Sequence, residues 1–237
     1  MLDIIYKAVS VSAVYCLLTV APVFSGDESC ISCHEQFKKP AKNVHKALDM
    51  GCDACHLSAE GLKHPAQKGS IKLRKDIPAL CYDCHAESKF NSKFVHSPVK
   101  WGICTDCHSA HQSEYTRMLV SDIPKLCFNC HENKTDKKYA HAPAAAGQCL
   151  LCHRAHGSEN AALLPKAVNN LCIGCHSNKA TGVHVLSGFK GVHPTWRMPD
   201  PSNPGKEMSC ASCHIPHGSD FPKLMPQAGL CRRCHKY

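Results

Sequence analysis

The sequence predicts a chain of loops and short α-helices, with little or no β-structure and with an interior that side chains do not fill. Three observations predict this fold class. Nineteen cysteines and eighteen histidines occur among 237 residues, whereas aromatic residues make up only 6%, so the material for a conventional core is scarce. Glycine, proline and polar residues interrupt the chain at short intervals. Apolar and polar residues rarely alternate, which argues against strands.

Residues 1–25 are predicted to be a secretory signal peptide. The apolar run 8–20 is short for a membrane span, and small residues follow it. Cleavage is expected before Gly26, with Ala21 as a second candidate, and an uncleaved membrane anchor is the alternative. Cys16 lies in this segment and would be removed with it. No later stretch is long and apolar enough to cross a membrane, so the mature protein is expected to have no stable transmembrane segment.

Beyond the signal peptide, every cysteine belongs to one of nine C-x-x-C pairs, and a histidine follows each pair. The nine motifs are Cys30, Cys33 and His34; Cys52, Cys55 and His56; Cys81, Cys84 and His85; Cys104, Cys107 and His108; Cys127, Cys130 and His131; Cys149, Cys152 and His153; Cys172, Cys175 and His176; Cys210, Cys213 and His214; and Cys231, Cys234 and His235. Cysteines three positions apart lie on one face of a helical turn, so both can form thioether bonds to the two vinyl groups of one haem. The next residue then presents its imidazole to the iron as the proximal ligand. The sequence thus predicts nine covalently bound haem c groups, whose chain or branched array organises the fold.

Zinc sites and disulfides are the alternatives for paired cysteines. C-x-x-C pairs also bind zinc, and cysteines of exported proteins often form disulfides. Neither requires a histidine after each second cysteine. With eighteen histidines in 237 residues, nine such coincidences have a probability of roughly 10⁻¹⁰. The motif count therefore favours haem attachment.

Nine further histidines remain, one for the second axial position of each predicted iron. They are His45, His64, His96, His111, His141, His156, His184, His193 and His217. A surplus histidine is ordinarily a surface or packed residue, but here the count matches and the positions repeat. Methionine is the alternative axial ligand, yet the six methionines show no repeating relation to the motifs. We therefore expect bis-histidine ligation throughout, and hence low-spin, low-potential iron.

The chain is predicted to consist of an N-terminal single-haem segment, 26–44, followed by four two-haem modules. Modules 1 to 4 are residues 45–95, 96–140, 141–192 and 193–237. Each module opens with a leading histidine, carries one motif and a second histidine, and closes with another motif preceded by leucine. Module 1 is looser, because its second histidine, His64, follows the proximal histidine by eight residues instead of three.

The positions of the surplus histidines limit which iron each can reach. A histidine three residues past a proximal ligand cannot pass around the macrocycle to the opposite face of the same iron. His111, His156 and His217 are therefore expected to ligate a different haem, most simply a neighbour. The leading histidines could reach either haem of their module. His184 and the first motif fall outside the module pattern, and pairing them by elimination would join the two ends of the chain.

Module 4 has a longer lead, residues 195–207, which contains three prolines. This segment is predicted to be a surface loop, either a spacer or a docking element. Secondary structure between the motifs should be sparse, with a turn or two of helix at each motif.

The formal charge of +9 is compatible with a nucleic-acid or acidic partner. Each oxidised haem, however, adds roughly one negative charge, because two propionates outweigh the ferric porphyrin. Nine haems would bring the protein near neutrality, so the lysines are expected to balance propionates. We expect no nucleic-acid partner.

The modules resemble the doubled C-x-x-C-H multihaem cytochromes through the pattern H…C-x-x-C-H-x-x-H-G-S…L-C-x-x-C-H in residues 141–176 and 193–235, and in residues 96–131 with Gln112 in place of the glycine. The resemblance covers most of the mature chain. It implies a multihaem cytochrome fold and electron relay in anaerobic metal-respiring or sulfate-reducing bacteria. The family includes periplasmic cytochromes that plug outer-membrane porins, and the wider group includes polymerising extracellular cytochromes.

The leading functional hypothesis is an electron carrier that is not an enzyme. The expected donor is an inner-membrane quinol-oxidising cytochrome, and the expected acceptor is an outer-membrane porin complex or an extracellular cytochrome. The protein is expected to be exported to the periplasm, with an outer-membrane-associated or extracellular location as alternatives. A reductase of nitrite, hydroxylamine or tetrathionate would need an open iron position, and none of the nine motifs is altered. A subunit of a conducting filament is the third hypothesis.

Overall fold

The computed structural model of the protein describes residues 28–180, 198–233 and 235. The predicted signal peptide with Cys16 lies outside these residues. So do His184, His193 and Cys234.

The secondary structure consists of single turns of helix and very short strands, as the predicted fold class requires. The α-helices are α1 (Glu28–Ile31), α2 (Ala79–Tyr82), α3 (Ser97–Lys100), α4 (Lys125–Phe128), α5 (Ala142–Ala145), α6 (Cys149–Cys152) and α7 (Val168–Cys172). The 3-10 turns are η1 (Glu35–Phe37), η2 (Lys46–Met50), η3 (Cys52–Ala54), η4 (Glu87–Phe90), η5 (Cys104–Asp106), η6 (Thr116–Met118), η7 (Ala161–Leu163), η8 (Ser177–Lys179), η9 (Cys210–Ser212), η10 (Pro222–Leu224) and η11 (Leu230–Arg233). The strands are β1 (Asn43–Val44), β2 (His56–Ser58), β3 (Ile71–Leu73), β4 (Phe94–Val95), β5 (Gln112–Ser113), β6 (Tyr139–Ala140), β7 (Gly157–Ser158) and β8 (Gly218–Ser219).

Each C-x-x-C-H motif forms a local turn. In eight of the motifs, the amide of the histidine donates a hydrogen bond to the carbonyl of the first cysteine at 2.9–3.0 Å. This i to i+4 bond is that of one α-helical turn, and it places both cysteines on one side of the turn. The five motif residues therefore adopt a binding geometry with little help from the rest of the chain.

In three of the four two-stranded sheets, the two residues just before the leading histidine of one module pair with a strand of the next module. β1 pairs antiparallel with β5, β4 with β7, and β6 with β8, whereas β2 and β3 form a hairpin inside module 1. At each inter-module sheet, the amide of a leading histidine donates to the carbonyl of a histidine in the next module. These bonds join His45 to His111, His96 to His156 and His141 to His217 at 2.8–3.0 Å. The strands thus set the register between successive modules.

A second junction brings the motifs of successive modules together. A Cβ on Gly102, which has a left-handed φ of 73°, would lie only 2.6 Å from Cδ of Pro78, so the two modules approach as closely as glycine allows. The same approach recurs between Gly147 and Pro124, at 2.7 Å. Nearby, the thiols of Cys81 and Cys104 are within hydrogen-bonding reach of each other.

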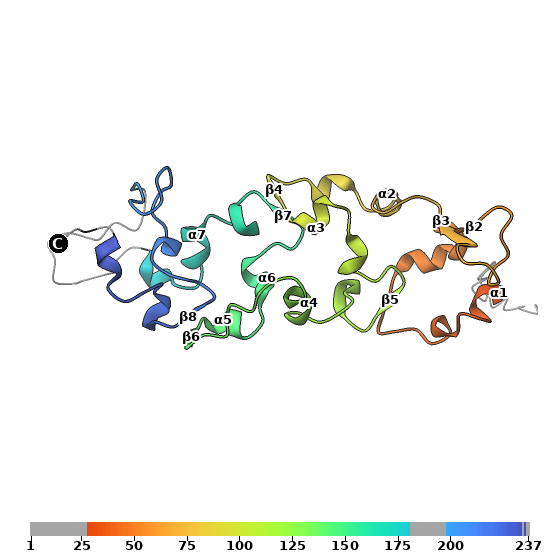
Figure 1. The fold of residues 1–237 in the computed structure, drawn as a ribbon, viewed down its shortest axis with the longest axis horizontal. Helices are drawn as coiled ribbons and strands as arrows, with labels where there is room; N and C mark the ends of the chain where they lie inside the picture. Colours follow the sequence, from red (N-terminus) through yellow and green to blue (C-terminus); the bar gives the residue numbers. More distant parts are fainter. Residues whose placement is uncertain (1–27, 181–197, 234, 236–237) are drawn as a thin grey trace, which may run out of the picture.

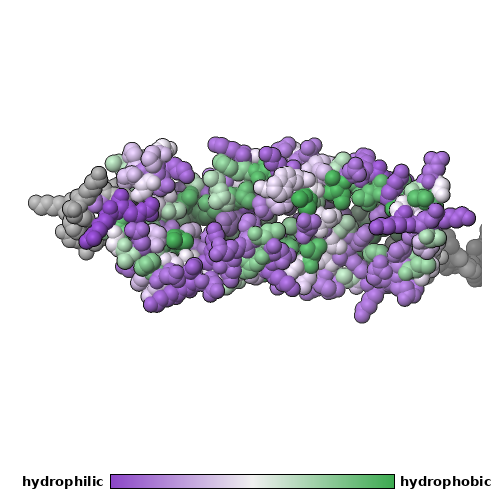
Figure 2. Space-filling view, in the orientation of Figure 1, coloured by the Kyte–Doolittle hydropathy of each residue, from purple (hydrophilic) through white to green (hydrophobic). Residues whose placement is uncertain are grey.

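The modules follow one another along an elongated molecule, from α1, β2 and β3 at one end to β8 toward the other (Figure 1). Among the described residues, Met208 is the only apolar side chain that counts as buried. On the face in Figure 2, hydrophilic side chains occupy both long margins and hydrophobic ones gather along the middle. The interior along this axis is a cavity and not a packed core. No helix in the described ranges is long and apolar enough to cross a membrane.

Candidate cofactor-binding sites

A continuous cavity of about 3810 Å³ runs through the molecule. This is several times the volume of roughly 300–1,000 Å³ that is usual for a single small-molecule pocket. The cysteines and histidines of the first seven motifs line it, together with Cys210 and His214 of the eighth. The seven described surplus histidines line it as well. The cavity therefore collects the metal-binding side chains of the chain in one connected space.

Within the cavity, seven proximal histidines each face one of the surplus histidines. Ring centroids in these pairs are 5.8–6.1 Å apart, with interplanar angles of 12–41°. The pairs are His34 with His64, His45 with His85, His56 with His111, His96 with His131, His108 with His156, His141 with His176, and His153 with His217. Two imidazole–metal bonds of about 2.0–2.1 Å, plus about 1 Å from each nitrogen to its ring centroid, span about 6 Å. Each pair is therefore spaced to hold one metal ion.

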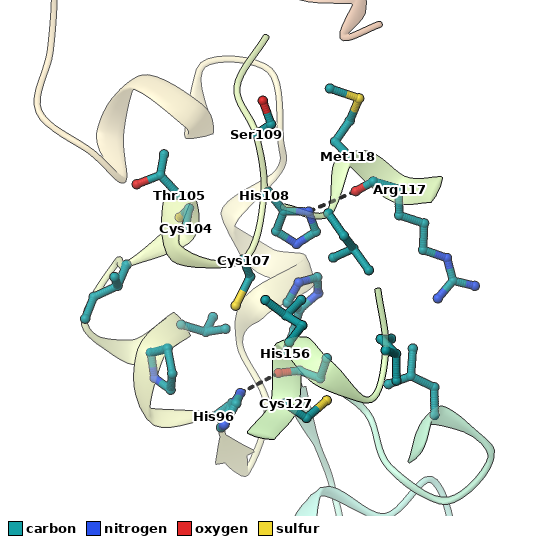
Figure 3. A pocket seen from close by; sticks show the side chains of 18 of the residues that line it. His96, Cys104, Thr105, Cys107, His108, Ser109, Arg117, Met118, Cys127 and His156 are labelled. Atoms are coloured by element: carbon teal, nitrogen blue, oxygen red, sulfur yellow. Dashed lines mark hydrogen bonds between the residues drawn. The ribbon is translucent and has the colours of Figure 1, made fainter. Parts of the chain in front are cut away.

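The pairs follow two rules. A leading histidine faces the proximal histidine of the second motif in its own module, as His45 faces His85. The histidine three residues past a first motif faces the first motif of the preceding module, as His156 faces His108 (Figure 3). The choice that the sequence left open for the leading histidines thus falls on the second motif.

The first motif obeys the second rule as well. His64 of module 1 faces His34 of the N-terminal segment, at 6.0 Å and 13°. The structure thus places His64 opposite the first motif, whereas His184, which the sequence suggested for that motif by elimination, lies outside the described residues. The physical reason is the longer loop of module 1, which carries its second histidine back to the N-terminal end.

Backbone carbonyls hold many of these imidazoles through Nδ1. Nδ1 of the leading histidines His45, His96 and His141 lies 2.8–2.9 Å from the carbonyls of Ala110, Ala155 and Pro216. Nδ1 of the proximal histidines His108, His153 and His214 lies 2.8–2.9 Å from the carbonyls of Arg117, Ala162 and Lys223. A carbonyl can only accept, so Nδ1 carries the proton and Nε2 keeps its lone pair for a metal.

The carbonyls that face the proximal histidines come from strained backbone. Modules 2, 3 and 4 each contain two consecutive left-handed residues that are not glycine, with φ of 54–60°: Arg117 and Met118, Ala162 and Leu163, Lys223 and Leu224. Left-handed backbone costs about 1–2 kcal/mol for such residues. The carbonyl of the first left-handed residue accepts from Nδ1 of the proximal histidine (Figure 3). The carbonyl of the second accepts, at 2.7–2.8 Å, from the backbone amide of the residue after that histidine. The left-handed conformation thus orients both carbonyls toward the end of the motif.

Burial favours the neutral form of the cross-module histidines His111, His156 and His217. Burial, reinforced by neighbouring cationic groups, lowers the pKa of His111, His156 and His217 below the ordinary value for histidine. A neutral imidazole is the form that binds a metal.

The donor set fits haem and does not fit zinc. A zinc site needs at least three protein ligands. In the ranges that the structure describes, no group of three or more His, Cys, Asp or Glu is placed to hold a metal ion. An imidazole pair supplies two ligands, and a porphyrin would supply the other four of an octahedral iron. The described cysteines form no disulfides with one another, and each pair lies beside a proximal histidine, where two thioether bonds to the same porphyrin would form.

Sequence reasoning missed several residues that support these sites. Ser113, Ser158 and Ser219 each bond through Oγ to a carbonyl six residues later, and this bond closes the loop that carries the left-handed pair. Their constant position, two residues after the cross-module histidine, is a signal that could have identified them. Ser70, which lies 3.1 Å from Nδ1 of His64, has no such repeat to mark it.

Comparison with known proteins agrees with this geometry. The chain matches the family described as the doubled CXXCH motif at residues 45–90, 96–136, 141–181 and 203–237. It is also 32% identical, over 116 residues, to Multiheme cytochrome MtrA of Shewanella baltica (strain OS185). The aligned region covers 44% of this chain and 32% of that protein, so the chain matches about a third of the relative's length.

Proposed function

Because this chain belongs to the doubled CXXCH family of multihaem cytochromes, we propose that it is a nine-haem electron carrier and not an enzyme. The family implies several covalently bound c-type haems. The number nine rests on the nine intact motifs of the sequence. Similarity to a multihaem cytochrome agrees with electron transfer as the activity.

The observation that carries the proposal is the set of seven facing imidazole pairs in one cavity. In the proposal, each pair provides the two axial ligands of one iron, and the cysteines before each proximal histidine form the thioether bonds. With both axial positions closed, an iron offers no place for a substrate to bind. Such a site favours electron transfer over substrate chemistry.

We extend the pairing rules to the last two motifs. His193 is the leading histidine of module 4, so by the first rule it would be the distal ligand of the haem whose proximal ligand is His235. His184 would then serve the haem of His214. These assignments complete nine axial pairs from eighteen histidines.

Haem held at these sites would supply one-electron transfer, which needs no acid, base or nucleophile from the chain. The chain sets the distances. The first cysteine of each second motif lies against the first cysteine of the next module, in the pairs Cys81 with Cys104, Cys127 with Cys149, and Cys172 with Cys210. These adjacent cysteines would hold two neighbouring haems by thioether bonds. The first carbonyl of each strained turn holds the imidazole of the proximal histidine in place.

We propose that the protein works in the periplasm, or in association with the outer membrane. Its donor would be an inner-membrane quinol-oxidising cytochrome, and its acceptor an outer-membrane porin complex or an extracellular cytochrome. The partial match to MtrA supports a place in a redox chain. Reconstitution with a candidate donor, followed by stopped-flow absorbance, tests each partner directly.

Two measurements test the haem content and its ligation. The intact mass of the purified mature protein should contain nine haem additions. The electron paramagnetic resonance spectrum of the oxidised protein should contain low-spin ferric signals alone. Fewer additions would overturn the haem count. A stoichiometric high-spin signal would overturn complete bis-histidine ligation and favour a reductase.

A further inference from the structure

His64 differs from the other described histidines in the group that accepts its Nδ1 proton. Backbone carbonyls face Nδ1 of His45, His96 and His141, and of the proximal histidines His108, His153 and His214. Nδ1 of His64 instead lies 3.1 Å from the side-chain Oγ of Ser70. A carbonyl is present whatever the side chain, whereas a hydroxyl is supplied by one replaceable residue.

Ser70 is held firmly where it meets His64. It is 2% exposed, the lowest value among the buried residues of the described chain. Its carbonyl accepts from the amide of Ala59 at 2.8 Å, and its amide donates to the carbonyl of Gln67 at 3.2 Å. These two bonds close the loop of module 1, so the hydroxyl has a fixed position beside the imidazole.

The hydrogen bond affects the electronic character of the ligand. When Nε2 binds iron, the neutral ring carries its proton on Nδ1, which donates to the hydroxyl oxygen. Donation draws the proton away from the ring and makes the imidazole a more basic ligand. A more basic axial ligand stabilises ferric over ferrous iron and lowers the reduction potential.

We propose that Ser70 is a positioning residue that lowers the reduction potential of the haem held by Cys30, Cys33 and His34. This inference rests on the proposed function, since it assigns His64 as the distal ligand of that haem. Cys30, one of its attachment residues, belongs to α1, which lies near β2 and β3 at one end of the described chain (Figure 1). An end haem exchanges electrons with a partner, so Ser70 sets the driving force of that exchange.

The test compares the reduction potentials of Ser70→Ala, Ser70→Thr and the unchanged holoprotein. Ser70→Ala should move one haem component to higher potential and leave the other components unchanged. Ser70→Thr keeps a hydroxyl and should restore the component toward its original position. Potentiometric titration followed by visible absorbance, with haem-resolved paramagnetic NMR, measures the shift and identifies the haem.

Thr135→Val is the matched control. The hydroxyl of Thr135 donates to Oδ1 of Asn133 at 2.7 Å and not to an imidazole, and Thr135 does not line the cavity. This variant removes a hydroxyl and should leave every potential unchanged. An unchanged titration of Ser70→Ala would overturn the proposal, as would a shift of equal size in Thr135→Val.

Failure of the proposed function is distinguishable from failure of this inference. If His64 were not a ligand, His64→Ala would leave the low-spin spectrum of the oxidised protein unchanged. One high-spin haem in His64→Ala, together with an unshifted Ser70→Ala variant, would reject the role of Ser70 alone.

Discussion

Ala162 carries backbone strain that a smaller residue would relieve. Its φ of 54° places it in the left-handed region, where an alanine costs about 1–2 kcal/mol and glycine costs little. Its carbonyl accepts from Nδ1 of His153, so the strained conformation is the one that the histidine requires. The strain is retained because the loop closed by Ser158 holds this residue in place.

We therefore expect Ala162→Gly to stabilise the holoprotein by about 1 kcal/mol, because glycine adopts this φ without strain. Ala144→Gly, in the middle of α5, is the control and should destabilise the protein by about 0.5–1 kcal/mol. Denaturant unfolding at equal haem content measures both. Equal losses in the two variants would contradict the strain argument.

His156 tests ligation across modules. Its ring faces His108 of the preceding module, 5.8 Å away, so His156→Ala should open the iron of the Cys104–Cys107 haem. We expect one haem-equivalent of high-spin ferric signal in the electron paramagnetic resonance spectrum.

The assignment to that haem is tested by removing its attachment. Cys104→Ala with Cys107→Ala, combined with His156→Ala, should show no high-spin signal, because the opened haem is gone. A high-spin signal that persists in the combined variant would place His156 on another iron.

At the scale of elements, the junction between Gly102 and Pro78 decides how closely two modules approach. Gly102→Ala should destabilise the protein, because the new Cβ would lie 2.6 Å from the proline ring at a left-handed φ of 73°. Gly61 has the same φ with no atom within 4 Å of an added Cβ, so Gly61→Ala measures the backbone strain alone, about 1–2 kcal/mol. The loss in Gly102→Ala should exceed that in Gly61→Ala when both are measured by thermal unfolding. Equal losses of stability in the two variants would mean that the two modules can move apart at this junction at little cost in free energy.

The lead of module 4 is anchored by a buried carboxylate. Asp200 is 4% exposed, and it accepts hydrogen bonds from Ser212 at 2.6 Å and from Asn203 at 2.9 Å. These bonds, that of Ser212 foremost, hold the pKa of Asp200 below its ordinary 3.8. The described part of this lead is therefore a loop fixed to the η9 turn of the eighth motif.

The stability that Asp200 adds depends on pH in a definite direction. Its folded pKa is depressed, so the contribution is present above 3.8 and is lost as pH falls through the folded pKa. Asp200→Asn should lower the thermal midpoint near neutral pH, and the gap from the unchanged protein should narrow in acid. Asp220→Asn removes an exposed carboxylate 3.7 Å from Lys137 and should change the midpoint little. A gap that widens in acid would contradict the assignment.

Elements that depend on local residues can be predicted from the sequence, whereas elements that depend on long-range contacts cannot. The turn at each motif is local, so the five residues predict it, and the structure confirms the predicted fold class. The inter-module strands are two residues long, too short for alternation to appear in the sequence. Whether His45 serves the first or the second motif of its module depends on the pairing of β1 with β5, which is a long-range contact. Ser70 was missed because a lone serine in a loop carries no pattern.

At the scale of the whole molecule, the axial pairs differ in their hydrogen bonds. His56 and His111 form the one facing pair, among those described, in which neither Nδ1 has a protein acceptor. The hairpin of β2 and β3 stands in module 1 where the later modules have their left-handed pair. Without an acceptor the two imidazoles are less basic ligands, so a haem between them should have a higher potential than haems held by the other six described pairs.

Removing single haems tests this order. Cys52→Ala with Cys55→Ala should delete a component of higher potential than the one deleted by the matched variant, Cys104→Ala with Cys107→Ala. Loss of a lower component in the first variant than in the second would contradict the prediction.

The pairing of histidines across modules also imposes a sequence in time on the making of the protein. Synthesis runs from the N-terminus, and the N-terminal haem and the first haems of modules 1 to 3 would each await a histidine of the module that follows. Each new module would close the open iron of the one before it and leave its own first iron open. A chain interrupted after module 1, 2 or 3 would therefore retain one iron with an open coordination position.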